Sequence, residues 1–320
     1  MVFDIIFIVL GVWLVLTGAD KLTDGASALA RRMKMPEIII GLTIVAAGTS
    51  APELFVSLVS ALKGTADLAV GNVVGSNIMN TMLIVGCAAV VAPMTISKST
   101  VRKDIPFSVG ASVLMLLLAF DSYLGRLDGI ILLLGFAAFM TYTLLQVRKT
   151  GASNQPEPSS QPEPSGQSGE KSVWVNVGWV VFGLVALVLG SNIFVDHASD
   201  LALALGISEG VVGLTVVAGG TSLPELATSV VAARKGQSAM AIGNVIGSNV
   251  FNILLILGLT ATISPLAIEG VTSLDMSVML VSAVLVWLFS FTRYKVERWE
   301  GAVLVIGYLA YLAWLLHNLT

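Results

Sequence analysis

The chain of 320 residues is 56% hydrophobic and only 12% charged, and its mean hydropathy is +0.90. A soluble domain carries about 25% charged residues, so this composition excludes a soluble globular protein and favours repeated membrane crossing. The net charge of −3 gives no support for a nucleic-acid partner, and the single cysteine, Cys87, excludes a disulfide within the chain.

Apolar stretches long enough to cross the bilayer recur along the whole chain. They predict an all-α polytopic membrane protein with ten spans, at about 2–30, 36–62, 66–92, 104–121, 126–147, 173–203, 208–233, 237–264, 272–292 and 299–318. The N-terminus, MVFDIIFIVLGVW, lacks the basic start of a signal peptide, so we expect it to be the first span and not a cleaved leader.

The segment GASNQPEPSSQPEPSGQSGEKS at 151–172 interrupts this apolar pattern. It is rich in Pro, Ser, Gln and Glu and has too few apolar residues to form a core, which is typical of a disordered linker. The linker divides the chain into residues 1–147, a linker region at 148–172 and residues 173–320, with five predicted spans in each half.

Basic residues predict the orientation. The loops after even-numbered spans hold only Lys63 and Arg126, whereas every loop after an odd-numbered span holds several Lys or Arg residues. By the positive-inside rule the second set of loops and the linker are cytoplasmic, and both termini are outside.

Residues 41–86 recur as residues 213–258 at a constant offset of 172, with about 27 of 46 positions identical. Because each half has an odd number of spans, the second copy enters the membrane in the opposite sense. Inverted repeats of this kind are typical of secondary transporters, with the site near the midplane at the repeat interface. A purely structural duplication is the alternative, and it is disfavoured because the polar residues are what the two copies share most closely.

Each copy contains a proline next to a glutamate, in GTSAPE at 48–53 and GTSLPE at 220–225. Proline cannot donate the expected backbone hydrogen bond, so we expect each span to break here, with Pro52 and Pro224 in the first turn of a new half-helix. The freed carbonyls near 46–49 and 218–221 become candidate cation ligands. Glu53 and Glu225 are intramembrane carboxylates, which indicate a functional site.

The second shared motif is GNVVGSNIMN at 71–80 and GNVIGSNVFN at 243–252. Its asparagines and serines form a polar stripe at spacing four along one helix face. The members of the two stripes are Asn72, Ser76 and Asn80, and Asn244, Ser248 and Asn252. Helix-to-helix hydrogen bonding at GxxxG contacts is one interpretation, which stands beside ion binding for Asn72 and Asn244. For the other four we favour ion binding.

These groups are hard oxygen donors with no His or Cys among them, which suits Ca²⁺ and argues against zinc or copper. Two ionised glutamates balance one Ca²⁺ or two Na⁺, with any further Na⁺ held by neutral oxygens. One site can therefore hold either load but not both, which produces exchange in an alternating-access protein.

The paired GTSxPE and GNxxGSN motifs closely resemble the α-repeats of sodium/calcium exchangers in the cation/Ca²⁺ exchanger superfamily. The resemblance implies a Na⁺/Ca²⁺ antiporter of a prokaryotic cell (inner) membrane that exports Ca²⁺, usually for three Na⁺, as the first and sixth spans slide past a fixed core. It implies no cofactor and no protein partner. The expected partners are the lipid bilayer and the transported Ca²⁺ and Na⁺.

By position, the resemblance assigns Glu53 and Glu225 as central carboxylates and Thr49 and Thr221 as Ca²⁺ ligands, largely through carbonyls. The flanking Na⁺ sites take Ala46, Ser50, Ser76, Ala218, Ser222 and Ser248, and the middle site takes Asn80 and Asn252. Potassium-dependent relatives have an aspartate at the position of Asn252, so this asparagine favours K⁺ independence. The proton-coupled branch carries an acidic residue near Gly75 and Ser76, which this chain lacks.

Other functions stay open on the sequence alone. Two glutamates could bind protons, which would give H⁺-coupled Ca²⁺ or Mn²⁺ exchange, and rings of oxygens also build channel filters. An enzyme is the least favoured class, because no Ser/His or Cys/His pairing accompanies the carboxylates. The duplicated Asp24 and Asp196, with Asp20, His197 and Asp200 nearby, fit helix ends or gate contacts as well as ion binding.

Overall fold

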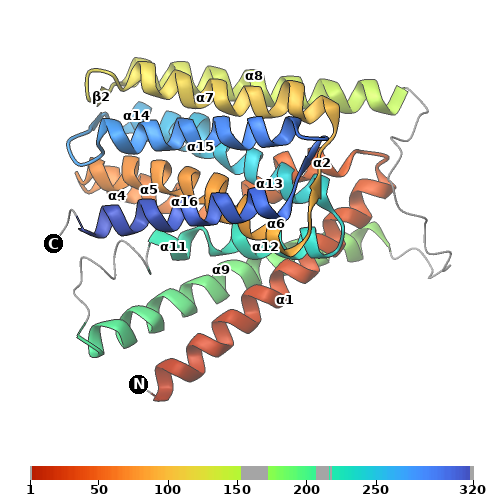
Figure 1. The fold of residues 1–320 in the computed structure, drawn as a ribbon, viewed down its shortest axis with the longest axis horizontal. Coiled ribbons are helices and arrows are strands. Elements are labelled where there is room, and N and C mark those ends of the chain that lie inside the picture. Colours follow the sequence, from red (N-terminus) through yellow and green to blue (C-terminus); the bar gives the residue numbers. More distant parts are fainter. Residues whose placement is uncertain (1, 153–171, 207–215, 217, 318–320) are drawn as a thin grey trace.

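The computed structural model describes residues 2–152, 172–206, 216 and 218–317. In these ranges the protein is almost entirely helical, as the composition predicts (Figure 1). Seven helices are long and apolar enough to cross a membrane, and a bent pair, Glu37–Thr49 with Ala51–Leu62, makes an eighth candidate. The predicted spans at 104–121 and 208–233 fall outside this set, the second because 207–215 and 217 lie outside the described residues. The count of ten therefore stays a prediction.

The first half follows the predicted order of elements. They are α1 (Val2–Arg32), α2 (Glu37–Ile40), η1 (Gly41–Val45), α3 (Ala46–Thr49), α4 (Ala51–Leu62), α5 (Ala66–Ile78), η2 (Met79–Ile84), α6 (Val85–Val91), β1 (Met94–Thr95), η3 (Thr100–Asp104), α7 (Ile105–Leu118), β2 (Tyr123–Leu124) and α8 (Arg126–Ala152). Helix α8 continues five residues beyond 147, where we expected the fifth span to end. The predicted linker lies mostly at 153–171, outside the described residues.

The second half repeats this order. Its described elements are α9 (Val173–Ala204), α11 (Ala218–Thr221), α12 (Leu223–Arg234), α13 (Ser238–Val250), η5 (Phe251–Leu257), α14 (Gly258–Ile263), β3 (Leu266–Ala267), α15 (Ser273–Phe291), β4 (Lys295–Val296) and α16 (Arg298–His317). The elements η2 and η5 are π-helical and occupy matching positions in the two repeats. π-Helical turns inside α-helices are frequent at functional sites, and no sequence pattern predicted these.

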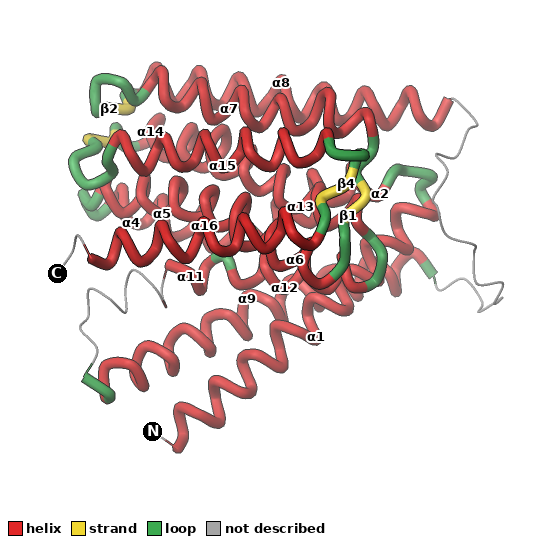
Figure 2. Tube along the Cα trace, in the orientation of Figure 1, coloured by secondary structure: helices red, strands yellow, loops and turns green. Residues whose placement is uncertain are grey.

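Two short antiparallel sheets carry the signature of the inverted repeat. Strand β1 pairs with β4, and β2 pairs with β3. At an offset of 172, β3 is the counterpart of β1, and β4 is the counterpart of β2. Each sheet therefore pairs one strand of the first repeat with one strand of the second, and the two sheets are counterparts of each other. The two sheets lie at opposite ends of the helix bundle (Figure 2). This arrangement agrees with the predicted topology, in which loops after odd-numbered spans share one side.

Helices α1 and α9 form an antiparallel pair that lies obliquely against the other helices (Figure 1). Their glycines face each other without side chains between them. A Cβ built on Gly18 would lie 2.8 Å from the carbonyl oxygen of Gly183, and one on Gly11 would lie 2.8 Å from that of Gly190. At the far end, His197 Nδ1 lies 3.1 Å from Asp4 Oδ1 and the His197 ring stacks on Phe7. Backbone contact along this length makes α1 and α9 one unit.

The helices that carry the duplicated GNxxGSN motif occupy the centre of the bundle. In Ser238–Ile263, 94% of an apolar 18-residue stretch is buried, and in Ala66–Val91 the share is 78%. In the other long helices only between 17% and 39% of such a stretch is buried, so these helices form the periphery. The glycines of α13 allow this close packing: a Cβ on Gly243 would lie 2.6 Å from the Ile38 carbonyl, and one on Gly247 2.7 Å from the Ala46 side chain.

Candidate functional site

Both predicted helix breaks are present. Helix α3 ends at Thr49 and α4 begins at Ala51, with Ser50 at φ −82° and ψ 7° between them and a bend of 46°. In the second repeat Ser222 takes the same conformation, φ −90° and ψ 6°, between α11 and α12. Pro52 and Pro224 lie in the first turn of the new helices, where proline lacks only an N–H that would have no helical partner.

The breaks are sharper than the expected unwound segments. The Ala46 carbonyl accepts a hydrogen bond from the Ser50 N–H at 2.9 Å, so it is not freed as we predicted. The physical reason is that only one residue leaves the helical conformation, so the hydrogen bond of the preceding turn survives. Proline does remove the usual donor to the carbonyls of Gly48 and Gly220, and Ser191 Oγ on α9 donates to the Gly220 carbonyl instead.

The two glutamates are held by serines of the opposite repeat. Ser50 Oγ donates to Glu225 Oε1 at 3.0 Å, and Ser222 Oγ donates to Glu53 Oε1 at 3.0 Å. Both carboxylates are buried, with exposures of 0% for Glu53 and 1% for Glu225. The breaks therefore meet in the interior, and each repeat completes the carboxylate environment of the other.

A serine of each central helix adds a further contact to each of these two serine–glutamate pairs. Ser248 Oγ lies 3.4 Å from Glu225 Oε1, and Ser222 Oγ lies 3.1 Å from Ser76 Oγ. The structure thus brings together Glu53, Ser222 and Ser76 as one set, and Glu225, Ser50 and Ser248 as its counterpart. The sequence predicted these six residues but not the exchange of serines between repeats.

Asn72 and Asn244 hold the backbone of the glutamates. Asn72 Nδ2 donates to the Glu53 carbonyl at 3.2 Å and to Ser57 Oγ at 2.9 Å. Asn244 Nδ2 makes the matching contacts, to the Glu225 carbonyl at 3.5 Å and to Ser229 Oγ at 3.0 Å. Of the two interpretations left open, these bonds favour hydrogen bonding between helices. Ser57 and Ser229 were missed, although their duplication was a usable signal.

Asn244 also reaches across the repeat interface. Thr49 Oγ1 lies 3.1 Å from Asn244 Oδ1 and 3.4 Å from the Ala46 carbonyl, and Thr49 and Ala46 are both buried. In the second repeat Thr221 is half-buried, and Ala218 begins α11 next to residues outside the described set. The structure therefore brings Thr49 and Ala46 to the break, and it places Ala218 only by its backbone.

The two middle asparagines differ from each other. Asn80 Nδ2 donates to Asn249 Oδ1 at 3.1 Å, a contact that the sequence did not predict. Within the described part of the chain, Asn80 Oδ1 and both polar atoms of Asn252 have no hydrogen-bond partner, although these side chains are 1% and 0% exposed. Glu53 Oε2 and Glu225 Oε2 also lack one.

Such oxygens define what the site can hold. An unpaired buried polar atom costs about 1–3 kcal/mol, so four such oxygens on residues of the two duplicated motifs indicate a ligand that accepts oxygen donors. Carboxylate, amide and hydroxyl oxygens are the donors that Ca²⁺ and similar hard cations take. The residues present therefore fit a site for hard cations at the repeat interface.

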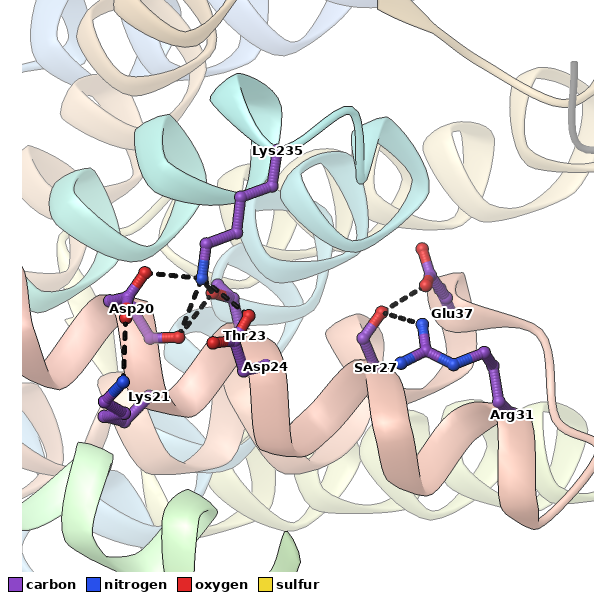
Figure 3. Close-up of polar contacts among 8 residues, drawn as sticks. All are labelled: Asp20, Lys21, Thr23, Asp24, Ser27, Arg31, Glu37 and Lys235. Carbon is purple, nitrogen blue, oxygen red and sulfur yellow. Dashed lines mark hydrogen bonds and ion pairs between the residues drawn. The ribbon is translucent and has the colours of Figure 1, made fainter. Parts of the chain in front are cut away.

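The other acidic residues that the sequence singled out lie on α1 and α9. Asp20 and Asp24 are in the second half of α1 near Lys235, with Glu37 and Ser27 in contact further along (Figure 3). His197 lies with Asp4 at the other end of the α1–α9 pair. Their positions fit the alternative of helix-end and gate contacts.

An inverted repeat whose broken helices meet at a buried pair of carboxylates defines a secondary transporter of ions. The profile of the family described as sodium/calcium exchanger protein matches residues 3–145 and 175–317. The chain therefore belongs to this family, and it is a multi-pass membrane transporter and not an enzyme.

Individual relatives agree over nearly the whole length. The chain is 33% identical to the sodium/calcium exchanger MaX1 of Methanosarcina acetivorans over 97% of both proteins. It is 38% identical to the inner membrane protein YrbG of Escherichia coli, covering 96% of this chain and 95% of that protein. A solved structure of the sodium-calcium exchanger NCX_Mj superposes with a TM-score of 0.83 at 30% identity, over 98% of this chain and 99% of the other.

Proposed function

We propose that this protein exports Ca²⁺ in exchange for Na⁺ across a prokaryotic inner membrane, with three Na⁺ entering per Ca²⁺ and without K⁺. The observation that carries the proposal is the buried pair Glu53 and Glu225, each with one carboxylate oxygen held by a serine of the opposite repeat and the other oxygen unpaired. Glu53 and Glu225 supply the charge that binds one Ca²⁺ or two Na⁺, and neutral oxygens of Asn80 and Asn252 supply a further place. Both termini are external and the linker is cytoplasmic.

Serines and threonines complete the proposed ligand set. Ser50, Ser222, Ser76 and Ser248 contact the carboxylates or one another, so an arriving Na⁺ would find hydroxyl and carboxylate oxygens together. Thr49 and Thr221, with Ala46 and Ala218, contribute through the backbone. The Ala46 carbonyl already accepts one hydrogen bond, and its second lone pair is the part available to an ion.

Energetics favour three Na⁺ over two. A tenfold Na⁺ gradient supplies about 1.4 kcal/mol per ion. Two Na⁺ for one Ca²⁺ move no net charge and supply about 2.8 kcal/mol, enough for a Ca²⁺ gradient of about 100-fold. A third Na⁺ adds about 1.4 kcal/mol and one net charge, worth about 2.3 kcal/mol at 100 mV. The total of about 6.5 kcal/mol supports a Ca²⁺ gradient above 10⁴-fold.

The test is ⁴⁵Ca²⁺ uptake into proteoliposomes of the full chain. We expect uptake only against an opposed Na⁺ gradient, in which Na⁺ leaves the vesicle as Ca²⁺ enters. An inside-positive membrane potential should stimulate this uptake, and replacing K⁺ by choline should leave it unchanged. Glu53→Gln and Glu225→Gln should each reduce uptake at least 100-fold. The matched control is Glu269→Gln, because Glu269 is an exposed carboxylate outside the site.

Different outcomes separate the alternatives. Uptake that follows a pH gradient and ignores Na⁺ would replace the proposal with H⁺-coupled exchange of Ca²⁺ or Mn²⁺. Uptake that needs no counter-ion would indicate a channel. Uptake that requires K⁺ would contradict the role assigned to Asn252.

A further inference from the structure

One lysine outside the ion site connects α12 to α1. Lys235, directly after α12, places Nζ 2.7 Å from Asp20 Oδ1 and 2.7 Å from Asp24 Oδ1. The same atom lies 2.9 Å from the Asp20 carbonyl and 3.0 Å from Thr23 Oγ1 (Figure 3). We call these four contacts the Lys235 latch. It joins the helix that begins beside Glu225 to the α1–α9 pair.

The repeat places a similar set, with one carboxylate fewer, at the opposite end. At an offset of 172, Lys63 after α4 is the counterpart of Lys235, Asp196 of Asp24 and Asn192 of Asp20. In the described structure Lys63 and Asp196 make no ion pair, and both are exposed. The outer face of α4 is also uncovered: Phe55 is 71% exposed, whereas its counterpart Ala227 on α12 is 7% exposed. Helix α1 packs against α12, and this contact buries the α12 face.

Contacts at the two helix breaks show the same asymmetry. A Cβ on Gly48 would lie 2.3 Å from Leu184, and a Cβ on Gly220 would lie 1.9 Å from Val195. Both contacting residues belong to α9. The repeat-related contacts would instead come from α1, with Val12 at Gly220 and Thr23 at Gly48. The α1–α9 pair therefore occupies one of two positions that the inverted repeat makes equivalent.

We propose that Lys63 and Asp196 form a second latch, which closes when the α1–α9 pair takes the repeat-related position, and that the two latches alternate during transport. This rests on the proposed antiport function. Since α1 and α9 contact each other backbone to backbone, one displacement both removes Asp20 and Asp24 from Lys235 and carries Asp196 to Lys63. The latches are mutually exclusive because they lie on opposite ends of one unit.

The two latches differ in strength. Lys235 has two carboxylate partners, whereas the Lys63 latch has Asp196 and the neutral Asn192. An exposed ion pair contributes about a two- to five-fold change in an equilibrium constant. The extra carboxylate therefore favours the position seen in the structure by about that factor. Asp20→Asn should bring the two positions closer to equal population.

The experiment is cross-linking in reconstituted full-length protein in which Cys87 is replaced by Ser. One variant carries Lys235→Cys with Asp24→Cys, and the other carries Lys63→Cys with Asp196→Cys. A short reducible bifunctional thiol reagent is required, because a lysine–aspartate contact spans more than a disulfide. We expect both pairs to cross-link, each reaction to stop ⁴⁵Ca²⁺ uptake, and reduction to restore it. Adding Asp20→Asn to the Lys63→Cys/Asp196→Cys variant, which keeps Lys235, should raise its cross-linking yield about two- to five-fold.

Two results would overturn the latch. One is absence of Lys63–Asp196 cross-linking in protein that still transports. The other is a Lys63–Asp196 cross-linking yield that Asp20→Asn leaves unchanged. Lys21→Gln is the matched control, because Lys21 contacts the same Asp20 at 3.3 Å but moves with it on α1; uptake and yields should not change. If the pairs cross-link but unmodified protein shows no Na⁺-dependent uptake, the antiport proposal fails and the latch stands.

Discussion

The two repeats carry the same residues at the ion site but do not make the same contacts. Asn80 is hydrogen-bonded to Asn249, whereas the counterpart of that bond, from Asn252 to Asn77, is absent among the described residues. Lys235 is latched and Lys63 is not. Asn80 and Asn252 are the same residue type, so their difference lies in conformation, whereas Lys235 differs from Lys63 because α1 packs against α12.

This comparison separates chemistry from conformation. Contacts that are equal in both repeats, such as Ser50 with Glu225 and Ser222 with Glu53, belong to the ion site itself. Contacts that occur in one repeat report which of the two positions the protein occupies. Substitutions of matched residues should therefore have equal effects in the first group and unequal effects in the second.

The glycines at the helix breaks provide the largest unequal effect. Gly220→Ala would place a Cβ 1.9 Å from Val195 Cγ2, whereas Gly48→Ala would place one 2.3 Å from Leu184 Cδ2. The leucine methyl ends a flexible side chain and can rotate, but the β-branched valine cannot. Overpacking costs about 1–3 kcal/mol. We expect Gly220→Ala to reduce Na⁺-driven Ca²⁺ uptake up to about 100-fold and Gly48→Ala by about five-fold.

A compensating change tests that explanation. Adding Val195→Ala to Gly220→Ala should restore most of the uptake, because it removes the methyl that the new Cβ meets. On the same helix, Gly178→Ala is the control, since its Cβ would meet nothing within 4 Å in the described structure. Equal losses for the two break glycines, or no rescue, would contradict the asymmetry.

The sequence predicted the site in outline because duplication marks it. Pro52 and Pro224 predicted the breaks, and the odd number of spans predicted that Glu53 and Glu225 meet. Sequence could not show that Ser50 contacts the opposite glutamate, since both repeats carry serine and the pairing depends on tertiary packing. It also could not predict which repeat has the unpaired asparagine, because Asn80 and Asn252 are identical and only the conformation distinguishes them.

The middle asparagines give the next contrast, in stability. Asn252→Leu removes two buried atoms without partners, so it should raise the free energy of unfolding by about 1–3 kcal/mol in ion-free buffer. Asn80→Leu removes one such atom, Asn80 Oδ1, but leaves Asn249 Oδ1 without its donor, so the two effects should largely cancel and the free energy of unfolding should change by less than about 1 kcal/mol. Thermal unfolding in detergent measures both.

Sodium should offset this gain in stability. Na⁺ stabilises a protein that binds it only when folded, so the wild type should unfold at a higher temperature with Na⁺ present. Asn252→Leu should lose part of that stabilisation, which would show that the unpaired atoms serve the ion. If Asn252→Leu is less stable than the wild type without ions, then Asn252 supports the fold and the proposed role is wrong.

The smallest expected effect concerns the carbonyls left by proline. Ser191 donates to the Gly220 carbonyl, but its counterpart on α1 is Ala19, which has no donor to offer Gly48. One hydrogen bond contributes about 1 kcal/mol, or about a five-fold change in an equilibrium constant. Ala19→Ser should therefore stabilise the repeat-related position, and Ser191→Ala should destabilise the position in the structure. Both should lower the Lys235-to-Lys63 ratio of cross-linking yields by about that factor.

In the double variant the donor is exchanged between the repeats, so its shift should be close to the product of the two single shifts. Shifts in opposite directions would show that Ser191 acts only within its own repeat and does not report the position of the α1–α9 pair.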